Sequence, residues 1–285
     1  MPEVVEWIDP DGLVTALDCD WDVTGRGLPP PRLDETGLPQ QPGRLLRAVS
    51  DDVRDHTWTL WLTGTSEADL WIRQRALLTA MDPERGDGLL RVTTPVGDQR
   101  ELVCRAIDGL HLVERLGSTS GPEVQQYTVT FRSHRPYWRD VADTTAGPWT
   151  PGSDPGGFFP FFPIRLVSSE VFADVSIDNV GDVPSWPVWT ITGPGHGLTL
   201  RNLTTGRVLS LPSAALAAGQ TLTIDTRPRR KSIRVGTANW FGEITTTSSL
   251  WSLAKGINVI RVELGAAAVD SSSVSLAYRR EYKVV

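Results

Sequence analysis

Alternation of apolar and polar residues runs through the first half of the chain and predicts β-strands. The segment TWTLWLT, residues 57–63, alternates large apolar side chains with threonines, which is the period-two pattern of a half-buried strand. Residues 89–107 show the same pattern on both sides of a turn at 95–98, and residues 127–132 repeat it. A strand-rich N-terminal half is therefore predicted.

One segment has helical periodicity instead. Ser66 stands where an N-cap is favoured, acidic residues follow it, and Leu70, Leu77 and Met81 recur at helical spacing before Pro83. Serine caps, early acidic residues and a terminating proline are typical helix boundaries. The pattern predicts one helix at about residues 66–82.

Short strands return after residue 164. Hairpins are predicted in residues 197–211 and 220–236, and two final strands in residues 258–266 and 274–282. Turns at such short, regular spacing favour an antiparallel β-sandwich. The second half is thus predicted to be entirely β.

Composition divides the chain into two domains. Residues 141–163 are rich in Pro, Gly and Phe and lack periodicity, so we interpret them as a linker between domains at 1–140 and 164–285. The FFPFFP run at 158–163 is expected to lie against a domain surface, because it is too apolar for a solvated linker. Residues 24–43 are polar and proline-rich, and are predicted to form an arm or long loop outside the core.

A run rich in proline, glycine and tryptophan, residues 179–195, predicts a rigid corner of the sandwich. Prolines donate no backbone hydrogen bond and fix the chain locally, so they belong at a sheet edge or corner. We expect its two tryptophans to occupy different environments, with at least one mostly buried. The residues assigned to this corner are Asn179, Gly181, Asp182, Pro184, Trp186, Pro187, Trp189 and Gly193.

Composition and charge narrow the function classes. The 285-residue chain has a formal charge of −6 and only two cysteines, which disfavours a nucleic-acid backbone as main partner and a disulfide scaffold as fold. No apolar run approaches the roughly 20 residues that cross a bilayer, so no membrane insertion is expected. Synthesis in the cytoplasm is expected.

No arrangement of residues predicts catalysis, a cofactor or a metal. The four histidines are scattered and no catalytic motif is present, so no catalytic, cofactor-binding or metal-binding residues are assigned. Asp174, Asp178 and Asp182 match no calcium-loop spacing and are interpreted as the solvated face of a strand. A basic turn is a candidate docking site for an acidic partner, with a solvated turn as the alternative; it comprises Arg227, Arg229, Arg230 and Lys231.

The order of these landmarks resembles the siphovirus-type tail component family, the distal tail proteins of long-tailed bacteriophages. The resemblance covers nearly the whole chain. In the first half it rests on QQPG, DPERGDGLLRV and FRSHRPYWRD around the Trp58 strand and the helix. In the second half it rests on FFPFFP, the corner run, LRNLTTGRVL and SSLWSLAKGINVI.

The resemblance implies a structural role in a virion. Family members form a hexameric ring at the distal end of the tail tube, between the tube protein above and tip-hub or baseplate proteins below, with the tape measure protein as a further candidate partner. Their fold is a split β-barrel-like tail-tube domain with one flanking α-helix, followed by a galectin-like antiparallel β-sandwich. DNA passes through the lumen without specific binding.

Two functions from different classes remain open. One is an assembly hub without enzymatic activity, and the other is a carbohydrate-binding receptor module of the tail tip. They differ in where the 11 tryptophans point. A hub buries most of them in cores and interfaces, whereas a sugar-binding module leaves at least one on a concave surface.

Overall fold

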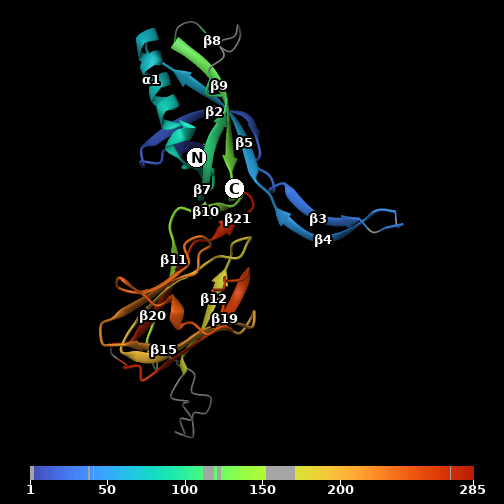
Figure 1. Cartoon of the computed structure of the whole chain (residues 1–285). Coiled ribbons are helices and arrows are strands. Elements are labelled where there is room, and N and C mark those ends of the chain that lie inside the picture. The colour runs from blue at the N-terminus through green and yellow to red at the C-terminus, as the bar shows by residue number, and fades with distance from the viewer. Residues whose placement is uncertain are drawn as a thin grey trace. The chain divides into compact units, whose positions relative to one another are not determined.

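The chain folds into two compact units, each described separately below. The computed structural model describes residues 3–37, 39–40, 42–111, 119–120, 123–151, 171–269 and 271–285. The N-terminal unit comprises Met1–Val141 together with Tyr282–Val285, and the C-terminal unit comprises Ala142–Glu281 (Figure 1). The FFPFFP run and the rest of the predicted linker from residue 152 lie outside the described residues.

Six strands of the N-terminal unit close into an antiparallel barrel. The sheet order is β21-β10-β7-β6-β1-β2-β5-β9-β8, and an additional pairing of β7 with β9 completes the circle. The first part of β7 pairs with β6, and its last part crosses over to β9, where Ala106 lies opposite Phe131. The strands are β1 Val4–Ile8, β2 Val14–Thr24, β5 Arg54–Thr63, β6 Gly88–Thr93, β7 Gln99–Asp108, β8 Thr119–Ser120, β9 Val124–Ser133, β10 Trp138–Asp140 and β21 Glu281–Tyr282.

Large aromatic side chains fill the barrel. Trp7, Trp58 and Phe131 are buried in its core, and the rings of Trp7 and Phe131 lie 5.1 Å apart between centroids. The indole nitrogen of Trp7 donates to the backbone oxygen of Ala80 at 2.8 Å. This bond ties the barrel to the end of the helix.

Helix α1, Glu67–Ala80, flanks the barrel (Figure 1). The Ser66 side chain accepts a hydrogen bond from the backbone nitrogen of Asp69 at 3.2 Å, so it is the N-cap that the sequence predicts. The helix ends at Met81, before the short 3-10 helix η1, Pro83–Arg85.

The proline-rich arm contains regular structure that composition does not predict. Residues Pro31–Gly37 form β3, which pairs in antiparallel register with β4, Arg44–Asp51. The pair is a separate two-stranded sheet that extends away from the barrel (Figure 1). Apolar residues are exposed on both of its strands, so the clear inside-outside contrast that marks a strand in a sequence is absent here.

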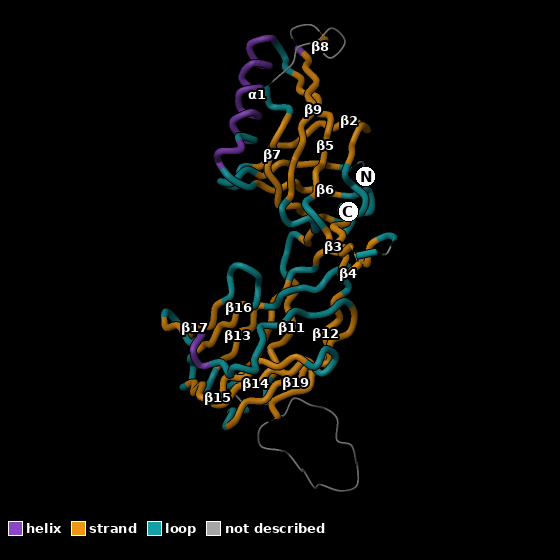
Figure 2. Tube along the Cα trace, turned by 45° about the vertical axis from the view of Figure 1, so that its right-hand side comes forward, coloured by secondary structure: helices purple, strands orange, loops and turns teal. Residues whose placement is uncertain are grey.

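The C-terminal unit is an antiparallel sandwich. One sheet has the order β11-β20-β13-β16-β17-β18 and the other β12-β19-β14-β15 (Figure 2). The strands are β11 Thr144–Trp149, β12 Val171–Asn179, β13 Val188–Thr192, β14 Gly195–Asn202, β15 Arg207–Leu216, β16 Thr221–Asp225, β17 Ser232–Val235, β18 Ala238–Asn239, β19 Gly256–Gly265 and β20 Ser273–Tyr278, and a 3-10 helix η3, Phe241–Glu243, follows β18. Barrel, flanking helix and sandwich confirm the predicted mainly β class.

The first described part of the predicted linker belongs to this sandwich. Strand β11 pairs with β20 from Thr144 to Trp149, with a bulge after Ala146. Trp149 also packs against the core. The bulge and the neighbouring Gly147 and Pro148 interrupt the alternation, which explains why the sequence does not predict a strand here.

Candidate functional site

The predicted corner is built around a buried asparagine. Asn179 is fully buried, and its side-chain oxygen accepts hydrogen bonds from the Gly181 backbone nitrogen and the Ser185 hydroxyl, both at 3.2 Å. Its side-chain nitrogen donates to the Val183 oxygen at 3.1 Å. One amide therefore satisfies three groups of the turn that follows β12.

Backbone hydrogen bonds from two other parts of the C-terminal unit hold the corner in place. Ser185 and Leu253 exchange backbone hydrogen bonds of 3.0 and 2.8 Å, and the Asp182 nitrogen donates to the Glu281 oxygen at 2.8 Å. A Cβ atom added at Gly181 would lie only 2.7 Å from that same Glu281 oxygen. The close approach of two backbones requires glycine here.

The two prolines of the corner lie in different surroundings. Pro184 is exposed, whereas Pro187 is buried, and its backbone oxygen accepts from the Thr226 hydroxyl at 2.6 Å. Gly193 follows β13, where an added Cβ would approach the Ala217 oxygen to 2.5 Å. These contacts link the corner to Thr226, which follows β16, and to Ala217, which follows β15.

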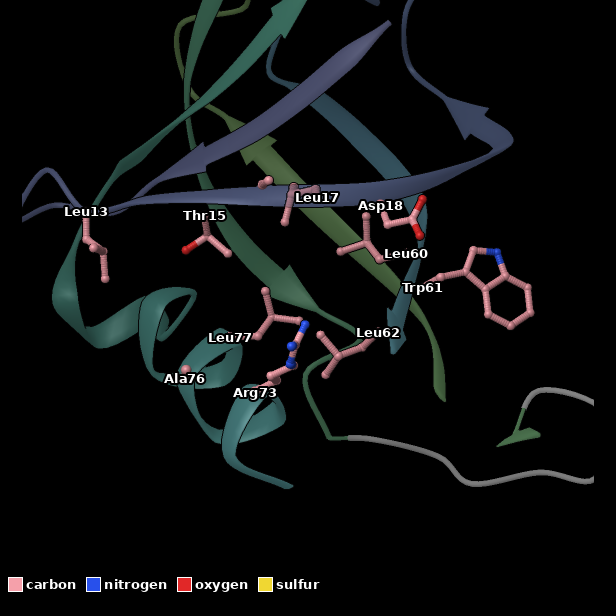
Figure 3. A pocket seen from close by; sticks show the side chains of 11 residues that line it. Leu13, Thr15, Leu17, Asp18, Leu60, Trp61, Leu62, Arg73, Ala76 and Leu77 are labelled. Carbon is pink, nitrogen blue, oxygen red and sulfur yellow. The ribbon is translucent and has the colours of Figure 1, made fainter. Parts of the chain in front are cut away.

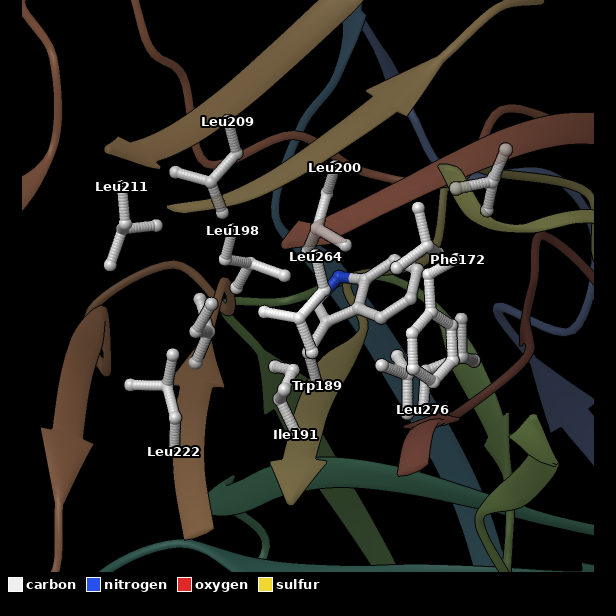
Figure 4. Close-up of a cluster of buried hydrophobic side chains, with 14 of the residues drawn as sticks. Phe172, Trp189, Ile191, Leu198, Leu200, Leu209, Leu211, Leu222, Leu264 and Leu276 are labelled. Carbon is white, nitrogen blue, oxygen red and sulfur yellow. The ribbon is translucent and has the colours of Figure 1, made fainter. Parts of the chain in front are cut away.

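The two tryptophans of the corner differ in burial. Trp189 is completely buried between the sheets, whereas Trp186 is half-buried. The Trp189 ring meets Trp251 edge to face, with centroids 5.7 Å apart. It lies in the centre of the cluster, beside Leu200 and Ile191 (Figure 4). Such a buried indole is a structural brace rather than a ligand surface.

The basic turn contains both paired and unpaired cations. Arg227 forms several hydrogen bonds with Asp225, the shortest at 2.6 Å. Burial acts to raise the pKa of Asp225, but the bonds from Arg227 outweigh it and leave the pKa below its ordinary value. Arg229 and Lys231 are exposed and have no acidic partner in the described residues.

A shallow hollow lies beside this turn. It has a volume of about 450 Å³ and is lined by Lys231, Ser232, Arg234, Thr237, Asn239 and Phe241. Two cations and several hydrogen-bonding side chains line it, and neither Trp186 nor Trp240 is among the lining residues. Its chemistry suits an acidic polar partner.

The tryptophans distinguish the two open functions. The two exposed tryptophans, Trp21 and Trp71, both belong to the N-terminal unit. The five tryptophans of the C-terminal unit are all buried or half-buried; they are Trp149, Trp186, Trp189, Trp240 and Trp251. The sandwich therefore presents no open indole for stacking on a sugar ring.

Titratable groups form no catalytic or metal centre in the described residues. No cluster of three or more metal-ligating side chains occurs there. Asp174 pairs with Arg261 at 2.7 Å and Asp182 with Lys255 at 3.2 Å, so these aspartates are solvated ion-pair partners. Burial raises the pKa of the half-buried Cys19 thiol to about 12, which keeps it protonated and unreactive.

His56 is the one strongly perturbed histidine. It is completely buried in the barrel, edge to face with Trp138. Burial, assisted by nearby Arg54 and Arg26, lowers its pKa to about 3. It is thus neutral at physiological pH and has no access to a substrate.

An apolar groove lies between the barrel and helix α1. Side chains from β2, β5 and α1 enclose a volume of about 240 Å³ (Figure 3). Leu17, Leu60 and Leu77 lie along it, with Asp18 and Arg73 at its border. No sequence pattern marks it, because the three elements that line it come together only in the fold.

The fold and the family comparison indicate a structural component of a phage tail. Residues 180–282, which include the corner from Val180 onward and the basic turn, match the family model described as Siphovirus-type tail component, C-terminal domain. Over these residues the match agrees with the resemblance seen in the sequence. In the described residues, no helix has the length and apolar character needed to cross a bilayer.

The solved structures most informative here come from phage tails. The crystal structure of SPP1 Dit, described as a paradigm of the hub adsorption apparatus in phages infecting Gram-positive bacteria, is similar over 99% of both chains, with 10% identity and a TM-score of 0.67. A chain of the phage P2 baseplate in its activated, calcium-containing conformation matches over 100% of both chains, with 12% identity and a TM-score of 0.54. A comparison with curated protein sequences found no match.

Proposed function

We propose that this protein forms a hexameric ring at the distal end of a phage tail, where it joins the tail tube to the tip or baseplate. The observation that carries this proposal is the similarity of fold to SPP1 Dit over 99% of both chains. The match to a tail-component family model and the similarity of fold to SPP1 Dit support a structural role. The protein would reside in the virion.

The partners follow from this position. The ring would contact the tube protein on one side and tip-hub or baseplate proteins on the other, with the tape measure protein as a further candidate. The N-terminal unit is the ring-forming part in this proposal. Its exposed Trp71 and Ile72, adjacent on helix α1, support it, because neighbouring large exposed apolar side chains are typical of interfaces.

DNA would pass through the lumen without being held. The N-terminal unit has 16 basic and 23 acidic residues, a net charge of −7, whereas the C-terminal unit has 12 and 11, a net charge of +1. An acidic wall forms few of the cation-phosphate contacts that retain nucleic acid. We expect no measurable binding of duplex DNA at physiological salt, and a strongly salt-dependent affinity of the full chain would contradict this.

Electron microscopy tests the ring. The purified full chain is imaged at rising concentration, and intact virions are labelled with an antibody against it. We expect six-fold rings in solution and label at the distal tail end. Label confined to the head, or along the whole tail, would overturn the proposal.

A carbohydrate-binding role is the second candidate. Only the hollow beside Phe241 and Lys231 favours it, since the tryptophans of the sandwich are not exposed. Binding of the full chain to an array of host-wall glycans, lost in Phe241→Ala, would support this role. If the full chain binds none of the glycans on the array, the carbohydrate-binding role is contradicted and the structural role is the one that remains.

A further inference from the structure

The β3–β4 hairpin has an apolar face that nothing in its own unit covers. Leu33 lies opposite Val49, and the next residue on the same face, Glu35, lies opposite Leu46. Residues paired across an antiparallel ladder point to the same side, so Leu33, Leu46 and Val49 form one continuous strip. All three are more than half exposed.

A hairpin of this kind gains stability from a partner. A two-stranded sheet is at best marginally stable alone in water, and three strands or packing against another element are normally needed. This hairpin extends away from the barrel as a sheet of its own (Figure 1). The apolar strip is therefore the surface that a partner covers.

The groove beside α1 has the complementary shape and chemistry. Its walls are aliphatic, and its volume of about 240 Å³ exceeds the roughly 150 Å³ in which an apolar cavity holds benzene. One or two aliphatic side chains fit such a space. The exposed Ala76 of α1 lies at its border (Figure 3), so a side chain can enter without displacing a large residue.

Charges at the two surfaces are also complementary. Asp18 borders the groove and Asp22 follows it on β2, both exposed and without a cationic partner in the described residues. Arg47 of the hairpin is exposed and lacks an acidic partner there. Arg73 at the groove is already neutralised by Asp69 at 3.0 Å, so it does not oppose an approaching arginine.

We propose that the β3–β4 hairpin of one subunit binds in the groove between β2, β5 and α1 of a second copy of this chain. The hairpin and the groove are different surfaces of the same unit, so the contact is head-to-tail and can repeat around a closed ring. This inference rests on the proposed ring. It specifies the contact that would hold the ring together.

Directed disulfide formation tests the contact. In a Cys19→Ser background, which leaves only the buried Cys104, Leu46→Cys is combined with Ala76→Cys. Arg75→Cys replaces Ala76→Cys in the matched control, because Arg75 is exposed on the same helix but is absent from the groove. A disulfide forms only between cysteines whose Cα atoms are close and whose side chains point toward each other. Mild oxidation of the assembled ring should therefore give covalent multimers of the Leu46→Cys and Ala76→Cys variant, and few or none of the Leu46→Cys and Arg75→Cys control.

Mixing establishes that the link joins different chains. A chain carrying only Leu46→Cys is mixed with one carrying only Ala76→Cys, and a covalent pair of the two is expected after oxidation. One outcome is that wild-type rings form while the Leu46→Cys and Ala76→Cys pair crosslinks no better than the control pair. In that case the proposed hairpin–groove contact is wrong, but the proposed ring is not contradicted. If neither wild-type solutions nor purified tails contain rings, the proposed function itself is overturned.

A charge substitution gives an independent readout. Leu46→Glu places a carboxylate on the apolar strip and should abolish the ring while leaving the melting temperature of the free subunit unchanged, because Leu46 is exposed there. Val269→Glu, a similarly exposed apolar position of the C-terminal unit, should keep the ring. Intact rings of the Leu46→Glu variant would contradict the contact.

Discussion

The two units bury their apolar residues differently. The sandwich buries 23 apolar residues in one cluster and the barrel 17. Of the 21 large apolar side chains that the described residues expose, the C-terminal unit holds six, Val180, Leu203, Phe241, Ile257, Val259 and Val269, and the N-terminal unit the other 15. The sandwich is thus nearly self-sufficient, whereas the barrel unit has apolar surface that assembly can cover.

Charge separates the units in the same way. The whole net negative charge of the protein lies in the N-terminal unit, and the C-terminal unit is close to neutral. Yet the sandwich carries Arg229, Lys231 and Arg234 near one sheet edge, and these cations have no acidic partner among the residues that the structure describes. The two units would therefore recognise different kinds of surface, apolar for the first and acidic for the second.

The largest effect is expected for the central indole of the sandwich. Trp189→Ala should lower the free energy of unfolding of the C-terminal unit by about 3–5 kcal/mol, as typical for truncating a buried indole. Trp186→Ala, at a half-buried position, is the matched control and should cost much less. Calorimetry of the full chain checks both, and equal melting of the two variants would contradict the bracing role of Trp189.

A smaller effect is expected at the buried amide of the corner. Asn179→Ala leaves the Gly181 nitrogen, the Val183 oxygen and the Ser185 hydroxyl without their partner. An unsatisfied buried polar group costs about 1–3 kcal/mol. Urea unfolding should show this loss in the C-terminal unit alone, and an unchanged midpoint would mean that other groups satisfy the turn.

Acid should distinguish the units through His56. The unfolded chain protonates this histidine with a pKa near 6.5, while the folded barrel keeps it neutral down to about pH 3. Between these values the unfolded state binds more protons, so the free energy of unfolding of the N-terminal unit decreases as the pH is lowered. At pH 5.5 it should be about 1 kcal/mol lower than at neutral pH.

The sandwich has only the exposed His196 and should lack this dependence. The variant His56→Phe, which retains a ring beside Trp138, should flatten the profile of the N-terminal unit between pH 6.5 and 4.5. The measurement is chemical unfolding followed across that range. An unaltered slope in the variant would assign the acid sensitivity to other groups.

The smallest effect on the free subunit is expected for an exposed indole. Trp21 is 98% exposed on β2, so Trp21→Ala should change the free energy of unfolding by no more than about 0.5 kcal/mol. If the barrel unit is covered on assembly, the same variant should weaken the ring. Thermal melting and ring formation measured side by side check this, and a large loss of stability in the free subunit would show that Trp21 packs within its own unit.

The local elements can be predicted from the sequence. The capped helix after Ser66, the hairpin turns at residues 95–98 and 204–206, and the alternating strands all depend on neighbours a few residues apart. The turn at the corner can also be predicted from its asparagine and glycine, Asn179 and Gly181, because turns favour particular residue types. Family resemblance follows from the same local landmarks.

The way in which these elements combine depends on contacts between remote parts of the chain. Closure of the barrel depends on the pairing of Ala106 with Phe131, two residues in strands separated by a long segment. Strands β3 and β11 carry weak periodicity, and they become strands because β4 and β20 supply their hydrogen-bond partners. The groove beside α1 arises only when β2 packs beside β5 and α1, which follow one another in the chain. Such contacts depend on complementary surfaces brought together by folding, which local residue patterns do not encode.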